Sequence, residues 1–199
     1  MSADLSEQIG PHPYFLYVGG ALPRKRFSWA FSVVQNLGPS PVTLVACGFT
    51  DGERTDVMSS LPPDVRPRVT FLPFVQEVDM PALYGRALAV LYPTLYEGFG
   101  FPALEAQAVG TPVLFSALGS LKELEGPLSR VLPPDDLRAW VDTCKAIVDK
   151  PTPERTAVDA ARLWARQFSW SVSARRHMEI YRESAAANRH GDRARAPQA

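Results

Sequence analysis

Two glutamates, Glu97 and Glu105, flank a run of glycine, aromatic residues and proline, Gly98-Phe99-Gly100-Phe101-Pro102. An apolar segment, Leu88–Tyr92, precedes this run, and the proline suits the first turn of a helix that Gly110 would close. The first N–H groups of a helix have no partner inside it, so backbone donors of the run could bind phosphate oxygens. The two carboxylates could accept hydrogen bonds from hydroxyl groups. Together these residue types fit a ligand that carries both hydroxyls and a diphosphate.

A second group of candidate residues is positively charged. The aromatic and β-branched segment Tyr14–Val18 ends at Gly19-Gly20, and Arg24, Lys25 and Arg26 follow shortly after. A run of three basic residues is by itself more often exposed surface charge. Its position just past a glycine-terminated strand favours phosphate binding instead, and Arg24 and Lys25 could balance the charge of a diphosphate.

These candidates need a scaffold that brings distant strand ends together. Six short, largely apolar segments are predicted strands: Tyr14–Val18, Val42–Cys47, Val69–Leu72, Leu88–Tyr92, Thr111–Phe115 and Arg130–Leu132. The predicted helices cover Phe27–Leu37, about Glu53–Ser60, Met80–Arg86, the segment from Pro102 to Gly110, Asp135 to about Lys150, about Pro153–Phe168 and about Ser171–Ala185. Asp79 and Asp135 are predicted N-caps.

The alternation of strands and helices predicts an α/β fold. Strands without polar alternation are typical of a parallel sheet covered on both faces, and right-handed crossovers then give a Rossmann-like doubly wound domain. Ligands of such sheets bind at the carboxyl ends of the strands. We therefore expect Gly19-Gly20 and the loop from Glu97 to Gly100 to lie at the same edge.

Length and composition predict one domain. A chain of 199 residues with 46% hydrophobic residues can bury one sizeable core, which we place at residues 14–187. Residues 1–13 are polar and contain two prolines, so they are expected to form a lead-in or linker. Residues 188–199 are rich in arginine and poor in large apolar groups, which predicts a disordered tail.

Charge and cysteine usage exclude several classes of partner. Basic and acidic residues both total 21, so no overall positive field favours nucleic acid or an anionic membrane. Cys47 and Cys144 lack the spacing of metal ligands, which favours reduced packing cysteines and a cytoplasmic protein. The start of the sequence does not have the pattern of a signal peptide, and no segment approaches the roughly 20 apolar residues of a membrane span.

The glutamate-containing motif also carries a family resemblance. The segment Tyr96–Ala106, followed by Gly110-Thr111-Pro112-Val113, resembles the signature of retaining glycosyltransferases of the GT-B fold, and within it family 4, the group 1 type. That family includes many bacterial mannosyltransferases and other hexosyltransferases. The resemblance covers roughly Tyr14 to Arg182 and extends to Tyr17-Val18-Gly19-Gly20, Pro23-Arg24-Lys25, the segment 69–75, Ala82-Leu83-Tyr84 and Phe168-Ser169-Trp170.

The resemblance implies roles for particular residues. Glu97 would contact the hexose of the donor and help to stabilise the transition state, and Glu105 would hold the ribose hydroxyls. The other donor-binding residues that it implies are Gly20, Arg24, Lys25, Phe99, Gly100 and Phe101. The last three would act through their backbone amides, and Arg24, Lys25 and the Gly20 backbone would bind the diphosphate. No metal and no cofactor are implied, and the sequence has no Asp-X-Asp motif.

The resemblance also implies a missing half. Family members resemble two Rossmann-like domains in tandem, and this chain matches the second, donor-binding domain. The expected function is retaining transfer from a GDP- or UDP-linked hexose in polysaccharide or glycoconjugate biosynthesis, inactive without an acceptor-binding domain or chain. The alternative is a non-catalytic nucleotide-sugar-binding or regulatory module that acts with a partner. Arg26 and Pro73 stand where the family often has Asn and Gly, and Pro73 lies beside the region that usually binds the base.

Overall fold

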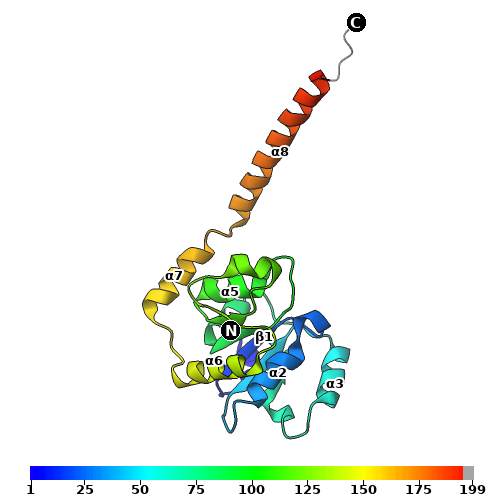
Figure 1. Ribbon diagram of the computed structural model, residues 1–199. Coiled ribbons are helices and arrows are strands. Elements are labelled where there is room, and N and C mark those ends of the chain that lie inside the picture. The colour runs from blue at the N-terminus through cyan, green and yellow to red at the C-terminus, as the bar shows by residue number, and fades with distance from the viewer. Residues whose placement is uncertain (195–199) are drawn as a thin grey trace. The chain divides into compact units, whose positions relative to one another are not determined.

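The first structural unit of the protein contains a single parallel sheet. The computed structural model describes residues 1–194, which divide into a unit Met1–Ala165 and a second unit that begins at Arg166. The six strands lie in the order β3-β2-β1-β4-β5-β6. Figure 1 labels β1 among the helices that surround it. Their bounds are β1 Tyr14–Val18, β2 Thr43–Cys47, β3 Val69–Phe71, β4 Ala89–Tyr92, β5 Val113–Phe115 and β6 Ser129–Val131. All paired strands are parallel, which confirms the predicted α/β, Rossmann-like fold.

Helices cover both faces of this sheet. The helices of the first unit are α1 Ala3–Ile9, α2 Phe27–Gln35, α3 Asp51–Ser60, α4 Met80–Arg86, α5 Phe101–Val109, α6 Leu137–Asp149 and α7 Arg155–Ala165. Three 3₁₀ helices lie in the connections to and from the strands: η1 Pro23–Lys25 after β1, η2 Arg66–Arg68 before β3 and η3 Gly119–Leu124 after β5. Helices α2 and α6 pack against each other, and α5 packs against α4 and α7.

The central strands are buried because their side chains enter two cores. Phe15 of β1 and Leu91 of β4 belong to the core that contains α2 and α6, and their side chains are completely buried. Leu16 and Val90, one residue along, are completely buried too, and alternation along a strand directs them to the opposite face. Burial on both faces explains why these segments are apolar at every position.

The first residues of the chain pack instead of forming a linker. Helix α1 lies within the expected lead-in, and its Leu5 and Ile9 are buried. Two apolar residues four positions apart lie on the same face of a helix, which gives α1 one apolar contact surface. The spacing of these two residues was the only sign of the helix in an otherwise polar segment.

Asp79 lies at the predicted N-cap position without a capping hydrogen bond, and the predicted cap at Asp135 is wrong. Asp79 stands at the N-cap position of α4, but its carboxylate accepts a hydrogen bond from the backbone N–H of Ser2 at 2.7 Å, and it caps no helix N–H. Helix α6 is capped by Asp136, one residue later than expected, whose carboxylate accepts from the third helical N–H. Asp135 pairs with Arg26 instead. In both cases a partner distant in sequence holds the aspartate.

The second unit contains the helix α8, Trp170–Ala194. Trp170, Met178, Ile180 and Tyr181 of this helix are among the exposed large hydrophobic residues. Residues 188–194 of the expected tail are therefore helical, and residues 195–199 lie outside the described part of the chain.

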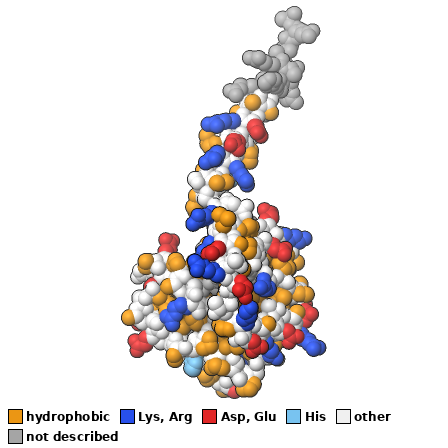
Figure 2. All heavy atoms as spheres, turned by 90° about the vertical axis from the view of Figure 1, so that its left-hand side faces the viewer, with side chains coloured by type: hydrophobic (Ala, Val, Ile, Leu, Met, Phe, Trp, Pro, Cys, Tyr) orange, Lys and Arg blue, Asp and Glu red, His pale blue; other side chains and the backbone are white. Residues whose placement is uncertain are grey.

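The surface charge of the first unit is mixed. Figure 2 shows acidic and basic side chains interspersed among apolar ones over the face in view. No helix within residues 1–194 has both the length and the apolar character that crossing a membrane requires.

We expect the stability of the fold to be most sensitive to substitutions of buried side chains in the central strands. We expect Leu91→Ala to lower the free energy of unfolding by about 2–5 kcal/mol, since it leaves a cavity in a fully buried strand. Leu163→Ala on α7 is the matched control, because that side chain is 69% exposed and should cost less than about 0.5 kcal/mol. Urea denaturation followed by circular dichroism measures both, and equal losses would contradict the assignment of β4 to the core.

Candidate functional site

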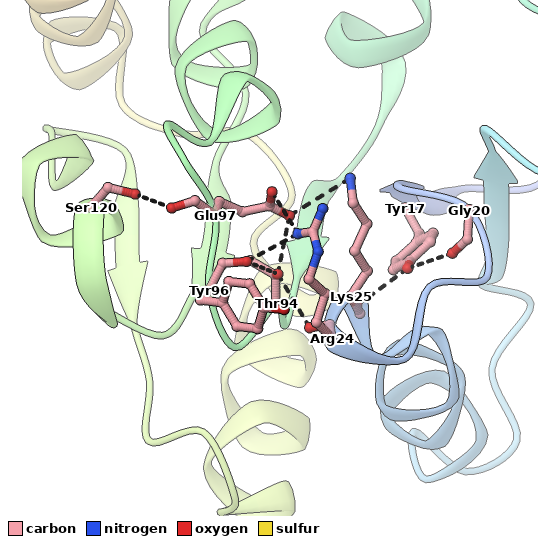
Figure 3. A network of polar contacts seen from close by, with 8 residues as sticks. All are labelled: Tyr17, Gly20, Arg24, Lys25, Thr94, Tyr96, Glu97 and Ser120. Carbon is pink, nitrogen blue, oxygen red and sulfur yellow. Dashed lines mark hydrogen bonds and ion pairs between the residues drawn. The ribbon is translucent and has the colours of Figure 1, made fainter.

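Loops from three strands meet at the carboxyl edge of the sheet. The chain after β1 carries η1, the chain after β4 carries Glu97, and the chain after β5 carries η3. The backbone N–H of Leu95 donates to the carbonyl of Arg24 at 2.9 Å, and the hydroxyl of Ser120 donates to the carbonyl of Glu97 at 2.7 Å. The chain after Gly19-Gly20 and the glutamate loop therefore lie at the same edge, as predicted, and the basic segment contacts the glutamate loop there (Figure 3).

Two glycines allow the loops to approach this closely. Gly20 has φ +71°, and a Cβ atom there would lie 2.5 Å from the carbonyl oxygen of Gly48, at the end of β2. Gly100 has φ +102°, and a Cβ atom would lie 2.5 Å from a methyl group of Leu121 in η3. Any larger residue would clash and would also be strained at these angles. Gly20 and Gly100 therefore have a steric cause, whereas a Cβ atom at Gly98 would meet nothing within 4 Å.

Glu97 lies between two cations. Its carboxylate is 2.7 Å from a guanidinium nitrogen of Arg24 and 3.6 Å from the ammonium of Lys25 (Figure 3). The Thr94 hydroxyl can donate to the same carboxylate at 3.1 Å. The Glu97 side chain is only 11% exposed, so these contacts are partly shielded from water. The site thus holds one carboxylate and two cations within contact distance.

These partners keep Glu97 ionised. Burial opposes ionisation, but the hydrogen bond from Arg24, the charge of Lys25 and the hydroxyls of Tyr92 and Thr94 outweigh it, and the pKa of Glu97 lies below its ordinary value. The carboxylate is therefore an acceptor at neutral pH. It can receive hydrogen bonds from hydroxyls or stabilise a neighbouring positive charge.

Arg24 and Lys25 are fixed by groups that the sequence did not reveal. A nitrogen of Arg24 donates to the carbonyl of Tyr96 at 3.0 Å, and the guanidinium carbon lies 5.4 Å from the centre of the Tyr96 ring. The buried Tyr17 hydroxyl lies 2.9 Å from the Gly20 carbonyl and 3.2 Å from that of Lys25. Burial, and then the charge of Glu97, raise the pKa of Tyr17, so it remains a donor. It ties η1 to the end of β1.

Glu105 is oriented by a buried tyrosine. The Tyr84 hydroxyl of α4 donates to the Glu105 carboxylate on α5 at 2.6 Å. Burial and the charge of Glu105 raise the pKa of Tyr84. Burial, and then the same carboxylate, raise the pKa of Cys47, at the end of β2, to about 12. Glu105 itself is exposed, so a ligand could reach a carboxylate with a fixed direction near the end of β2.

The two carboxylates thus act on different parts of the edge. Glu97 raises the pKa of Tyr17 on β1 and Tyr92 on β4, whereas Glu105 acts on Cys47 and Tyr84. One ligand could span both if it extends along the strand ends.

The remaining predicted residues form the start of α5. Gly100, in a left-handed conformation, precedes the helix and has no side-chain cap, and its carbonyl accepts from Ala103. Phe99 and Phe101 are partly exposed, and their ring centres are 4.8 Å apart. Their predicted binding through backbone amides stays a prediction.

No group of three or more His, Cys, Asp or Glu side chains in residues 1–194 could hold a metal ion. The positive charge that the structure places beside Glu97 belongs to Arg24 and Lys25.

The low pKa of Glu97 predicts how stability depends on pH. The carboxylate is ionised in the folded state down to a lower pH than in the unfolded state, whose pKa is close to the ordinary value of about 4.5. Its contribution to stability is present above that value and is lost as the pH falls through the folded pKa. As the pH falls through this range, we expect the free energy of unfolding of Glu97→Gln to decrease less than that of the wild type. Urea unfolding of both proteins at a series of pH values measures the difference. Parallel plots of the free energy of unfolding against pH would contradict the prediction.

Comparison with known proteins identifies the family. The family model described as glycosyl transferases group 1 matches residues 6–164. The O-antigen chain mannosyltransferase RfbU of Salmonella typhimurium is 31% identical over 149 residues, 75% of this chain and 42% of that protein. A D-inositol 3-phosphate glycosyltransferase of Salinispora arenicola is 36% identical over 155 residues, 73% of this chain and 34% of that protein. The chain spans less than half the length of these relatives.

Solved structures agree on the fold. Sucrose-phosphate synthase from Thermosynechococcus elongatus superposes with a TM-score of 0.78 and 28% identity, covering 94% of this chain and 49% of that one. Anabaena Alr3699/HepE, solved in complex with UDP-glucose, gives a TM-score of 0.74 at 20% identity, over 92% of this chain and 52% of that one, and supports the fold alone. The family match over most of the sequence, together with this fold, establishes that the chain belongs to the group 1 family of glycosyltransferases.

Proposed function

We propose that this chain is the donor-binding part of a retaining glycosyltransferase that uses a nucleotide-diphosphate hexose. The observation that carries the proposal is the position of Glu97 between Arg24 and Lys25 at the ligand-binding edge of the sheet. The relative named as an O-antigen chain mannosyltransferase and the neighbour solved with UDP-glucose support this choice of donor. An acceptor-binding domain or chain would complete the enzyme, since the chain spans less than half the length of the mannosyltransferase and the D-inositol 3-phosphate glycosyltransferase that it resembles in sequence.

Arg24 and Lys25 are suited to the diphosphate. A diphosphate carries more negative charge than the one carboxylate that these cations contact in the structure. Guanidinium and ammonium groups make strong charge-assisted hydrogen bonds with phosphate oxygens. When the bond to the sugar breaks, negative charge increases on the leaving diphosphate, and preorganised cations stabilise it. The Gly20 backbone, with no side chain in the way, can lie beside the same group.

Glu97 is suited to the hexose. Its low pKa keeps it ionised, so it can accept hydrogen bonds from sugar hydroxyls. As the diphosphate departs, the sugar ring takes on positive charge, and a carboxylate nearby stabilises that charge. The resemblance of the motif to retaining enzymes is the support for retention of configuration.

Glu105 is suited to the nucleoside. Its carboxylate is exposed, is held in one direction by Tyr84 and acts electrostatically on Cys47 at the end of β2. A ribose offers two neighbouring hydroxyls, which a fixed carboxylate can accept together. The donor would then extend from Glu105 at the nucleoside to Glu97 at the sugar.

Nucleotide titration tests the donor site. We expect UDP or GDP to bind in isothermal titration calorimetry, and Glu105→Ala and Lys25→Ala each to weaken binding about tenfold or more, since each removes a charged partner. Glu7→Ala on α1 and Lys145→Ala on α6 are matched controls on exposed helix positions and should leave the affinity unchanged. Failure of both nucleotides to bind the wild-type chain would rule out the donor site.

A variant of Glu97 separates the sugar from the diphosphate. In Glu97→Gln both cations lose a competing carboxylate, so binding of the nucleotide diphosphate should be retained or strengthened. Binding of the nucleotide sugar should weaken relative to the diphosphate, and transfer with an acceptor-binding part present should fall about a hundredfold or more. The ratio of the two dissociation constants is the measurement. An unchanged ratio would remove Glu97 from the sugar site, and the absence of transfer in the wild type would favour a binding module.

A further inference from the structure

Arg26 has an unusual backbone conformation next to the proposed diphosphate site. It is the only residue other than glycine with positive φ in the described part of the chain, at φ 52° and ψ 50°. The Cβ atom of an L-residue makes this left-handed conformation unfavourable. Such strain persists only where the surroundings hold the residue, and it tends to occur at functional sites. Arg26 directly follows Arg24 and Lys25.

The Arg26 side chain is fixed by three groups. One terminal nitrogen donates to the carbonyl of Pro134 at 2.7 Å, and the other contacts the carboxylate of Asp135 at 2.9 Å. The guanidinium lies over the Trp29 ring, 4.2 Å from its centre. Its side chain is 16% exposed. Planar stacking together with two directed hydrogen bonds is a combination that arginine can make and lysine cannot.

The Arg26 backbone closes one turn and opens the next. Its N–H donates to the Pro23 carbonyl at 3.1 Å, which ends η1. Its own carbonyl accepts from Trp29 at 3.0 Å and Ala30 at 3.3 Å, which begins α2. The direction in which the side chains of Arg24 and Lys25 leave η1 therefore depends on the angles at residue 26. Pro134 and Asp135 precede α6, so the Arg26 side chain also ties the start of α2 to the start of α6.

We propose that Arg26 is a positioning residue of the donor site: its left-handed backbone, held by Pro134, Asp135 and Trp29, orients Arg24 and Lys25 toward Glu97 and the donor diphosphate. The diphosphate part of this inference rests on the proposed function. Arg26 acts through its two neighbours, because its own guanidinium is occupied on the α6 side. A contribution to stability alone is the competing explanation.

Four variants separate these explanations. Arg26→Ala removes the side-chain contacts, and alanine disfavours the left-handed backbone angles. Arg26→Asn also removes the contacts, but asparagine tolerates these angles. Asp135→Ala removes one contact at a side chain that is 79% exposed. Arg68→Ala is the matched control, since Arg68 is also partly buried and bonds the carbonyls of Val42 and Gly38, before β2 and away from the carboxyl edge.

Three quantities are measured on each full-length variant. The affinity for inorganic pyrophosphate is measured by calorimetry, the pKa of the Glu97 carboxyl by carbon-13 NMR titration, and the melting temperature by circular dichroism. We expect Arg26→Ala to weaken pyrophosphate binding about tenfold and to raise the pKa of Glu97 toward its ordinary value. Arg26→Asn should recover part of both losses, and Asp135→Ala should show a smaller change in the same direction. Arg68→Ala should lower only the melting temperature.

The outcomes distinguish this inference from the proposed function. If wild-type protein does not bind pyrophosphate, the diphosphate site is wrong, and the pKa of Glu97 in Arg26→Ala alone decides whether Arg26 positions the two cations. Wild-type affinity and an unchanged Glu97 pKa in Arg26→Ala would overturn the inference. Equal losses of pyrophosphate affinity and an equal rise in the Glu97 pKa in Arg68→Ala would assign Arg26 to stability alone. No recovery in Arg26→Asn would overturn the role of the left-handed backbone.

Discussion

The ion pairs of Glu97 with Arg24 and Lys25 join the ends of β1 and β4, and the local structure of the edge follows from them. Three charges at partly buried positions are stable only when each has partners, because an unpaired charge there is costly. The neighbouring groups supply those partners: the Thr94 hydroxyl contacts the carboxylate, and the Tyr96 carbonyl accepts from Arg24. The parallel sheet makes this possible, since β1 and β4 are neighbours and end at the same edge.

The same arrangement gives the two carboxylates different properties. Glu97 is 11% exposed and ion-paired, so its charge is neutralised locally, and a ligand must compete for its cations. Glu105 is exposed, and the hydroxyl of Tyr84 holds it in one direction. A carboxylate that is bonded only by a neutral hydroxyl can accept further hydrogen bonds, which suits sugar hydroxyls. A carboxylate in an ion pair is instead sensitive to the charge of a ligand that binds its cations. The difference between the two environments supports the different roles proposed for them.

The sequence predicted the features that depend on local pattern. Continuous apolar strands indicated a doubly covered parallel sheet. Such a sheet places the ends of β1 and β4 at one edge, so the shared edge of Gly19-Gly20 and the Glu97 loop followed from topology. Features that depend on distant partners were missed. Tyr84 orients Glu105 from 21 positions away, and nothing in the sequence around either residue reveals the pairing. Asp79 lies at the expected N-cap position, but its carboxylate bonds to Ser2, 77 positions away, and makes no capping hydrogen bond.

On the proposed function, these ion pairs also link donor binding to the state of Glu97. A diphosphate that draws Arg24 and Lys25 toward itself weakens their hold on the carboxylate and brings negative charge nearby, and both changes raise the pKa of Glu97. The carboxylate, less neutralised by its cations, then presents more negative charge to the sugar at the moment when the departing diphosphate leaves positive charge there. Such an exchange requires the two cations to reach both partners from one fixed turn. The backbone conformation of Arg26, between that turn and α2, would therefore set the direction from which the two cations reach Glu97 and the diphosphate.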